Sequence, residues 1–242
     1  MTTLAHIADG TSSSEPFTVS NSGWGTDTRG LVAVVSAYNA SATITHTVTG
    51  GGVTWTTAVA REYGGRRSVE LFESDGTPSG GDLTIDASGS TGSYVESMYS
   101  VDEVAAWLGT GSVVVTTGVS SGTGLTALGI SSLGTLTGGQ IVYASIGVEG
   151  GTTADLVGDD GGATHTSLFT FKTGGSDVRA FLSIDADVDA APGFTWTNAA
   201  DAGMLGAILS DGSTGSHGGG GGGGLSVPGI THSFAVTRAS NY

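Results

Sequence analysis

The chain has 242 residues, of which 22 are Asp or Glu and 7 are Lys or Arg, so its formal net charge at neutral pH is -15. Such a chain repels nucleic acid, whose binding rests on contacts between cations and phosphates. The hydrophobic residues, 38% of the total, lie mostly in short runs separated by Gly, Ser and Thr, as closely spaced strands and tight turns do. We therefore expect an all-β protein that binds no nucleic acid.

The composition excludes several further classes. There is no cysteine, so neither disulfides nor thiolate metal sites contribute. The 44 glycines are accompanied by only 4 prolines, which excludes a collagen-like repeat. No basic N-terminal region precedes an apolar stretch, and no apolar run is long enough for a membrane span, so we expect neither a signal peptide nor membrane insertion.

In the first half, seven segments alternate or are rich in β-branched residues and are bounded by Gly, Ser, Asn or Asp. They are 16–20, 30–39, 42–50, 55–63, 68–74, 82–88 and 93–101. We expect a short helical turn from Asp102 to Leu108. The second half continues the strand pattern with SVVVTTG, LTALGIS, QIVYASIGV, SLFTFKT, VRAFLSIDADV, GFTWTN and MLGAILS.

The two halves also match each other faintly at an offset of about 110 residues. Gly51-Gly52-x-Thr54-x-Thr56 lies over a similar Gly-Gly-x-Thr-x-Thr run at 161–166. This predicts one sandwich made of two similar halves, 20–105 and 130–211. Chance matching between glycine-rich strands is the alternative explanation.

The chain divides into four parts. An N-terminal arm, 1–14, precedes the sandwich at 15–211. A Gly-rich linker, 212–224, is too flexible to hold a core position. The segment 225–242 alternates as one more strand, either an edge strand of its own domain or a strand donated to a partner.

Catalytic patterns are absent from the sequence. Glu70 and Glu73 lie three residues apart on one strand, which points them to opposite faces, whereas glycoside hydrolysis needs two facing carboxylates. There is no Gly-x-Ser-x-Gly motif, phosphate loop or dinucleotide fingerprint. We therefore expect no enzyme, no catalytic residue and no cofactor.

Five acidic residues offer oxygen atoms that suit calcium. They are Asp159, Asp160, Asp185, Asp187 and Asp189. Their spacing lacks the glycine and terminal glutamate of a calcium loop, which favours a solvated acidic edge. The histidines are scattered, and we expect His46 and His165 to be partly exposed sheet residues rather than metal ligands.

Five aromatic residues are candidates either for a sugar-stacking platform or for the core. They are Trp24, Trp55, Tyr63, Tyr99 and Trp196. Trp55 and Trp196 lie in alternating Thr-Trp-Thr contexts, which favours burial. Three arginines flank a Gly-Gly turn and form a basic cluster, which we expect to be solvated or paired with an acidic neighbouring molecule. They are Arg61, Arg66 and Arg67.

The strand series GLVAVVSAY, GGGVTWTTAVAREYGGRRSVELFES, GGDLTIDAS and YVESMYSVDEV resembles a jelly-roll domain of phage tail and capsid-associated proteins. The resemblance covers 15–211 and rests on strand pattern, so it assigns no functional residue. It implies a jelly-roll-like antiparallel β-sandwich and a structural protein on the surface of a bacteriophage virion. The role would be head decoration, head fibre, or tail or baseplate component.

The partners implied by this resemblance are copies of the same chain, for example in a trimer, other virion proteins, and a glycan of the host surface. The low charged fraction, 12%, suits close packing between subunits because Thr, Ser and Asn must then cover the surface. The competing class is a carbohydrate-binding module or receptor-binding adhesin, in which exposed aromatic residues are the working surface.

Overall fold

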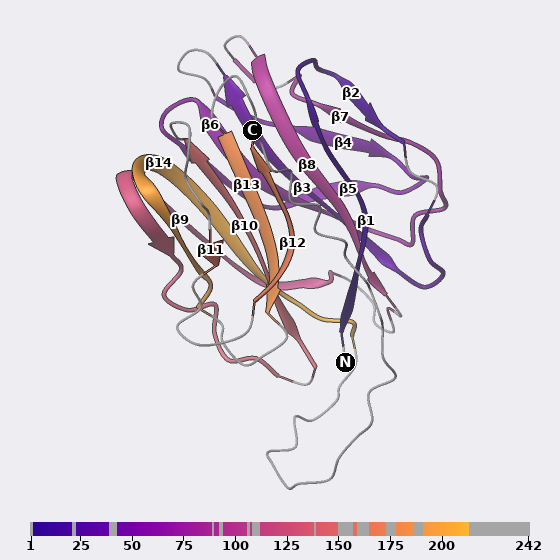
Figure 1. Ribbon diagram of the computed structural model, residues 1–242. Helices are drawn as coiled ribbons and strands as arrows, with labels where there is room; N and C mark the ends of the chain where they lie inside the picture. Colours follow the sequence, from indigo (N-terminus) through magenta and orange to yellow (C-terminus); the bar gives the residue numbers. More distant parts are fainter. Residues whose placement is uncertain are drawn as a thin grey trace, which may run out of the picture.

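The computed structural model is all-β, with antiparallel strands and no helix in the residues that it describes (Figure 1). These are residues 2–20, 23–38, 43–88, 90–91, 94–105, 107, 112–137, 139–149, 157–158, 165–172, 178–185 and 191–212. The linker from residue 213 and the terminal segment 225–242 lie outside the described residues. So do four of the five candidate calcium ligands, Asp159, Asp160, Asp187 and Asp189.

Three antiparallel sheets make up the fold. Sheet A has the order β1 (Thr3–Ser12), β8 (Tyr94–Ala105), β3 (Arg29–Tyr38), β6 (Arg67–Ser74) and β5 (Trp55–Tyr63). Sheet C has the order β11 (Val157–Gly158), β14 (Gly193–Leu209), β10 (Ile141–Glu149), β13 (Val178–Asp185) and β12 (His165–Lys172), and β9 (Val114–Gly129) also pairs with β14. The small sheet B has the order β2 (Phe17–Val19), β7 (Leu83–Asp86) and β4 (Thr47–Gly50).

Sheets A and C contain five-strand paths of the same connectivity. Sheet A reads β1-β8-β3-β6-β5, and sheet C reads β9-β14-β10-β13-β12. In each path the strands stand in the order first, fifth, second, fourth and third along the chain. The second and fifth strands, β3 with β8 and β10 with β14, are therefore interior neighbours in both sheets.

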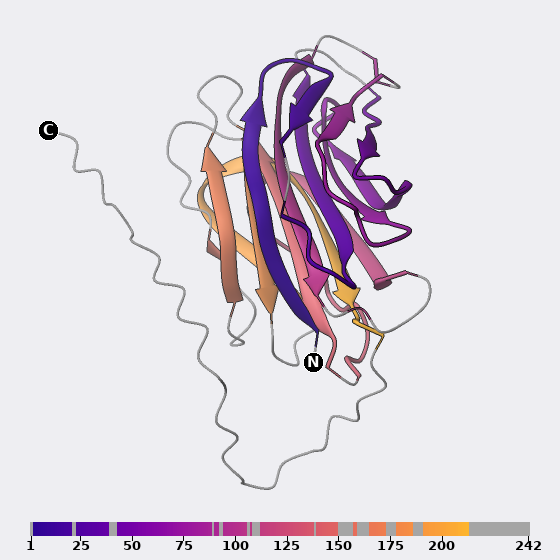
Figure 2. The same cartoon turned by 90° about the vertical axis from the view of Figure 1, so that its right-hand side faces the viewer.

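Sheets A and C pack face to face around one hydrophobic core (Figures 1 and 2). Sheet A contributes Leu31, Ala33, Val35, Val69, Leu71 and Met98, and sheet C contributes Ile141, Tyr143, Leu205, Ala207 and Leu209. The central strands β3 and β10 are buried along nearly their whole length. This explains why they read as continuous apolar runs and not as alternating patterns.

The outer faces of both sheets are covered as well. Sheet B packs on sheet A through Phe17, Val48, Leu83, Ile85 and their neighbours. On sheet C, Ile130 and Leu133 cover the face that carries Gly118 and Gly206, where an added Cβ would approach either side chain to about 3 Å. These glycines leave room for the covering segment, so the central strands of both sheets are interior.

Most predicted strands are confirmed, and two expectations are wrong. The expected helical turn begins inside β8, which continues as a strand to Ala105. Val101 and Val104 are buried there, and Asp102 pairs in register with Leu31, so sheet pairing overrides the local helical preference. The expected N-terminal arm contains β1, which pairs with β8 over nine positions and belongs to sheet A.

Tyr63, at the end of β5, joins sheet A to sheet C. Its ring lies over Gly147 and Gly203, which are direct partners in the register of β10 and β14. A Cβ on Gly203 would lie 2.7 Å from the Cγ of Tyr63, and a Cβ on Gly147 would lie 2.6 Å from a methyl carbon of Val35. Only glycine at both positions leaves space for the Tyr63 ring.

We predict that Gly147→Ala lowers the free energy of unfolding by about 1–3 kcal/mol through overpacking and that Tyr63→Ala lowers it by about 3–5 kcal/mol through lost burial. The Tyr63 hydroxyl is buried without a hydrogen-bond partner in the described part of the chain. Tyr63→Phe should therefore be neutral or stabilising. Urea denaturation measures the free energy of unfolding of all three variants. An unchanged free energy of unfolding in Gly147→Ala would contradict this packing.

Candidate functional site

The described residues contain two polar clusters built around histidines, and the first resembles a catalytic triad in outline. His46 Nδ1 lies 2.7 Å from Glu70 Oε1, and His46 Nε2 lies 2.9 Å from Ser36 Oγ. Ser36 comes from β3 and Glu70 from the neighbouring strand β6, while His46 precedes β4. A serine, a histidine and an acid thus stand in the order that acyl-transfer enzymes use.

Two features remove the catalytic capacity of this cluster. A second carboxylate oxygen, from Glu15, lies 3.2 Å from His46 Nε2, the same nitrogen that contacts Ser36. Ser36, His46 and Glu70 are only 0%, 2% and 2% exposed, so no substrate reaches the serine. Burial lowers the pKa of His46, but hydrogen bonds and charges from Glu15 and Glu70 outweigh it and raise the pKa to about 9.

The His46 imidazole is consequently protonated at neutral pH and unable to accept the serine proton, because both ring nitrogens donate to carboxylates. The cluster is a buried ion network that holds sheet B on sheet A. The sequence-based expectation that His46 is partly exposed is wrong, since sheet B covers this face of sheet A. Glu70 and Glu73 do lie on opposite faces, with Glu73 accepting hydrogen bonds from Ser112 and Val113.

The second cluster joins β1 and β8 to sheet C. Asp102 is fully buried and accepts hydrogen bonds from Ser100 Oγ at 2.6 Å and from Tyr143 Oη at 3.2 Å. His6 Nδ1 lies 2.8 Å from Asp102, and His6 Nε2 lies 2.8 Å from Asp9. The hydrogen bond with Asp102, opposed by burial and helped by Asp9, raises the pKa of His6 to about 8.

The candidate aromatic platform is not assembled. Trp55, Tyr63 and Trp196 are 9%, 4% and 5% exposed and belong to the interior, which confirms the burial predicted for the two tryptophans. Trp24 packs on Trp55 with ring centroids 6.0 Å apart, and Tyr99 packs against a phenylalanine of β2. These residues stabilise packing between layers and do not form one exposed row.

The arginine cluster makes contacts within the chain. The expectation that it is solvated or paired with another molecule is wrong for the buried Arg67, whereas Arg61 is exposed and the Arg66 side chain is 41% exposed. Arg66 and Arg67 contact Glu149 of β10 at 3.0 and 2.7 Å, and Arg61 donates to Ser121 of β9. Arg67 is only 3% exposed. These contacts connect β5 and β6 of sheet A to sheet C, and no sequence signal identified Glu149 as the partner.

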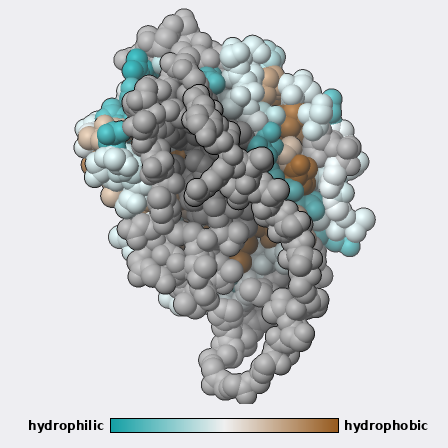
Figure 3. Space-filling view, viewed as in Figure 1, coloured by the Kyte–Doolittle hydropathy of each residue, from teal (hydrophilic) through white to brown (hydrophobic). Residues whose placement is uncertain are grey.

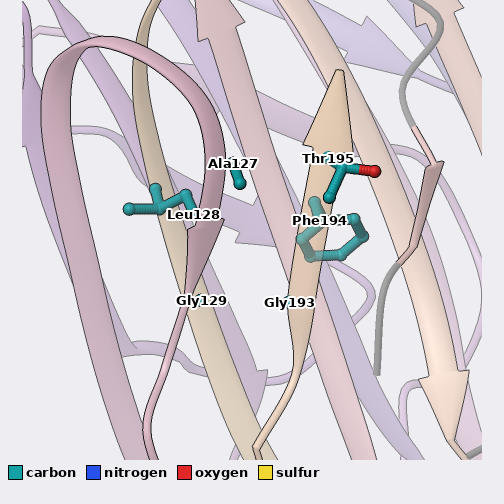
Figure 4. A pocket seen from close by; sticks show the side chains of 6 residues that line it. All are labelled: Ala127, Leu128, Gly129, Gly193, Phe194 and Thr195. Carbon is teal, nitrogen blue, oxygen red and sulfur yellow. The ribbon is translucent and has the colours of Figure 1, made fainter. Parts of the chain in front are cut away.

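Two surface pockets of the described part are large enough to consider as binding sites. The larger, about 620 Å³, is lined by Gly50, Gly52, Val53, Thr54, Asp75 and Gly76, and Asp75 accepts a hydrogen bond from the Thr54 N–H at 2.9 Å. The smaller, about 250 Å³, lies where β9 and β14 pair, and Phe194 and Thr195 face it beside Ala127 and Leu128 (Figure 4). The smaller pocket contains no titratable side chain.

The free edge of β9 is the most unusual surface feature of the described residues. β9 spans 16 residues without a charged side chain, and it pairs with β14 on one side (Figure 1). No strand of the described part pairs with its other side. Among the described residues, two large hydrophobic side chains are exposed, Val115 at 53% and Val119 at 40%. Both belong to β9.

Elsewhere the visible surface is weakly polar. On the face shown in Figure 3, the described residues are mostly pale on the hydropathy scale, as a covering of Thr, Ser and Gly predicts. Within the ranges described above, no three His, Asp or Glu side chains are grouped as a metal site requires. The same residues include no helix long and apolar enough to cross a membrane.

Comparison with protein-family models, curated proteins and solved structures finds no match to this chain. The described residues offer buried ion networks, a polar surface pocket and the long uncharged edge of β9.

We predict that the protein loses stability as pH rises from about 6.5 to 9. The pKa of His46 is raised from 6.5 to about 9 in the folded chain, so the stability that it contributes is complete below pH 6.5 and lost through pH 9. The loss should be on the order of 3 kcal/mol. Urea denaturation at pH 6 and pH 9.5 measures it.

His6 provides the control for this prediction, because its pKa is raised only to about 8. A His6→Asn variant should therefore retain most of the loss of stability between pH 6 and pH 9.5. Equal stability at both pH values, or a decline abolished by His6→Asn, would show that the His46 network is not the origin.

Proposed function

We propose that this chain is a non-enzymatic structural protein on the surface of a bacteriophage particle, where it assembles with copies of itself and with other virion proteins. The observation that carries the proposal is the long uncharged edge of β9. The phage assignment follows from the resemblance of the strand series to jelly-roll domains. The shared connectivity of the two five-strand paths supports a jelly-roll-like sandwich of two similar halves.

The edge strands of this fold differ in how they are protected. Soluble monomers usually place charges, prolines or covering loops on edge strands, because a bare edge pairs with another chain. In this fold β1 carries His6 and Asp9, and β5 carries Arg61 and Glu62. β9 carries no charge and exposes Val115 and Val119, which favours pairing with a subunit over exposure to solvent.

The non-enzymatic part of the proposal is supported by the two histidine clusters of the described residues. The histidines of both clusters donate to carboxylates, and Ser36 and Asp102 are fully buried. In this arrangement the charged groups stabilise the packing of three layers. Charged residues make up only 12% of the chain, which suits subunit contacts because charged residues are depleted at the core of protein interfaces.

Light scattering of the purified full-length chain tests the assembly role. We expect a discrete oligomer, with a mass several times the 23.8 kDa of one chain. This mass should stay constant when the protein is diluted. A monomer at all concentrations would overturn the assembly role and move attention to ligand binding.

The second candidate function is carbohydrate binding, and the pocket of about 620 Å³ beside Asp75 favours it. Asp75 and Thr54 are exposed, and carboxylate and hydroxyl oxygens of this kind bind sugar hydroxyls. If the pocket binds a glycan, Asp75→Ala should abolish binding on a glycan array while Asp86→Ala does not. Unchanged binding in Asp75→Ala would exclude this pocket.

A further inference from the structure

We propose that the C-terminal segment 229–238 of one chain adds as a strand to the free edge of β9 in a second copy. The inference rests on the proposed assembly role and names the surface and the segment that carry it. Addition of a strand to an open edge supplies main-chain hydrogen bonds, while alternate side chains supply the specificity.

The acceptor is the first part of β9, from Val115 to Val119. Beyond it, Ser121 receives hydrogen bonds from Arg61 of β5, so β5 approaches the strand there. Val119 lies opposite Leu205 in the register with β14. The exposed Val115 and Val119 therefore extend the apolar surface of sheet C to its edge, and an incoming strand would bury both.

The donor segment has the complementary sequence. Ile230, His232, Phe234 and Val236 alternate with Thr231, Ser233 and Ala235, which suits a strand with one mainly apolar face. All 22 acidic residues of the chain lie before residue 213, so the donor carries none of them. Arg238 gives the donor a positive charge, so its approach to a body of net negative charge is favourable.

The place where the described chain ends also supports the proposal. Leu209 at the end of β14 pairs with Val114 at the start of β9, and the Ser210 N–H donates to the carbonyl of Val113 at 3.0 Å. The chain therefore passes the start of β9, one strand from the acceptor edge, and the buried Asp211 then donates its N–H to Thr2 Oγ1 at 3.0 Å. Subunits arranged around an axis would bring this end of the described chain close to the β9 edge of a neighbour.

The length of the tether favours a neighbour over the same chain. Reaching the free side of β9 in the same chain requires about two strand spacings, roughly 10 Å, which a connection of a few residues spans. The tether 213–224 reaches roughly 40 Å when extended. That reach exceeds the local need and is long enough to extend beyond the chain's own β9 to an adjacent subunit.

The cysteine-free sequence allows a direct test by disulfide formation in the full-length chain. Thr117→Cys marks the acceptor edge, and Ser233→Cys or Phe234→Cys marks either face of the donor. Two singly substituted chains are co-expressed and oxidised, so only a bond between chains is registered. We expect a covalent dimer of Thr117→Cys with a donor variant, separated by non-reducing electrophoresis.

Three results would overturn the inference. One is a covalent dimer that forms equally well when Thr11→Cys, on the exposed end of β1, replaces Thr117→Cys. Another is a disulfide that forms within single chains of the double variant Thr117→Cys/Ser233→Cys while the mixed single variants form no dimer. This result would place the segment on the β9 of its own chain. The third is a dimer from Thr117→Cys alone, which would show pairing of two β9 edges.

A charged side chain placed on the acceptor edge provides an independent test. Val119→Lys should raise the apparent dissociation constant of the oligomer at least about tenfold, and Thr11→Lys should leave it unchanged. If the full-length protein is an oligomer that Val119→Lys does not weaken and no Thr117→Cys bond forms, the β9 inference fails while the assembly role stands. If the full-length protein is a monomer, both the β9 inference and the assembly role fail.

Discussion

The burial of β3 and β10 on both faces is the constraint on which the rest of the structure depends. Each strand lies at the centre of a sheet whose two faces are covered, by the opposite sheet on one side and by sheet B or Ile130 and Leu133 on the other. A strand in this position has no contact with water, so the side chains on both faces must be apolar, small or paired. The continuous apolar runs of both strands meet this requirement.

The same constraint explains the two histidine clusters. Polar side chains that enter these layers need partners within the protein, since an unpaired buried charge is costly. His46 with its two glutamates, and Asp102 with its three donors, satisfy this need, and they connect sheet B to sheet A and sheet A to sheet C. Groups that are typical of catalysis in an open cleft thus serve as internal connections, because accessibility and protonation decide what a serine, a histidine and an acid can do.

Because both histidine clusters are buried, interaction of the described part with other molecules must use its edges and surface loops. The contacts of Tyr63, Arg61 and Arg67 connect one edge of sheet A to sheet C, which protects β5. No strand of the described residues pairs with the first part of β9. An edge strand without charges is costly in a protein of low surface charge unless a partner covers it, as the proposed assembly would.

The sequence by itself determined the all-β class, most strand positions, the burial of Trp55 and Trp196, and the opposite orientations of Glu70 and Glu73, because period-two patterns and turn residues are local signals. Only the tertiary structure decided that 102–105 extends a strand, that 3–12 is an edge of sheet A, that His46 is buried, and that Glu149 pairs with two arginines. These features depend on contacts between residues far apart in the chain. Local patterns carry no information on which sheet covers a face or which strand is left at an edge.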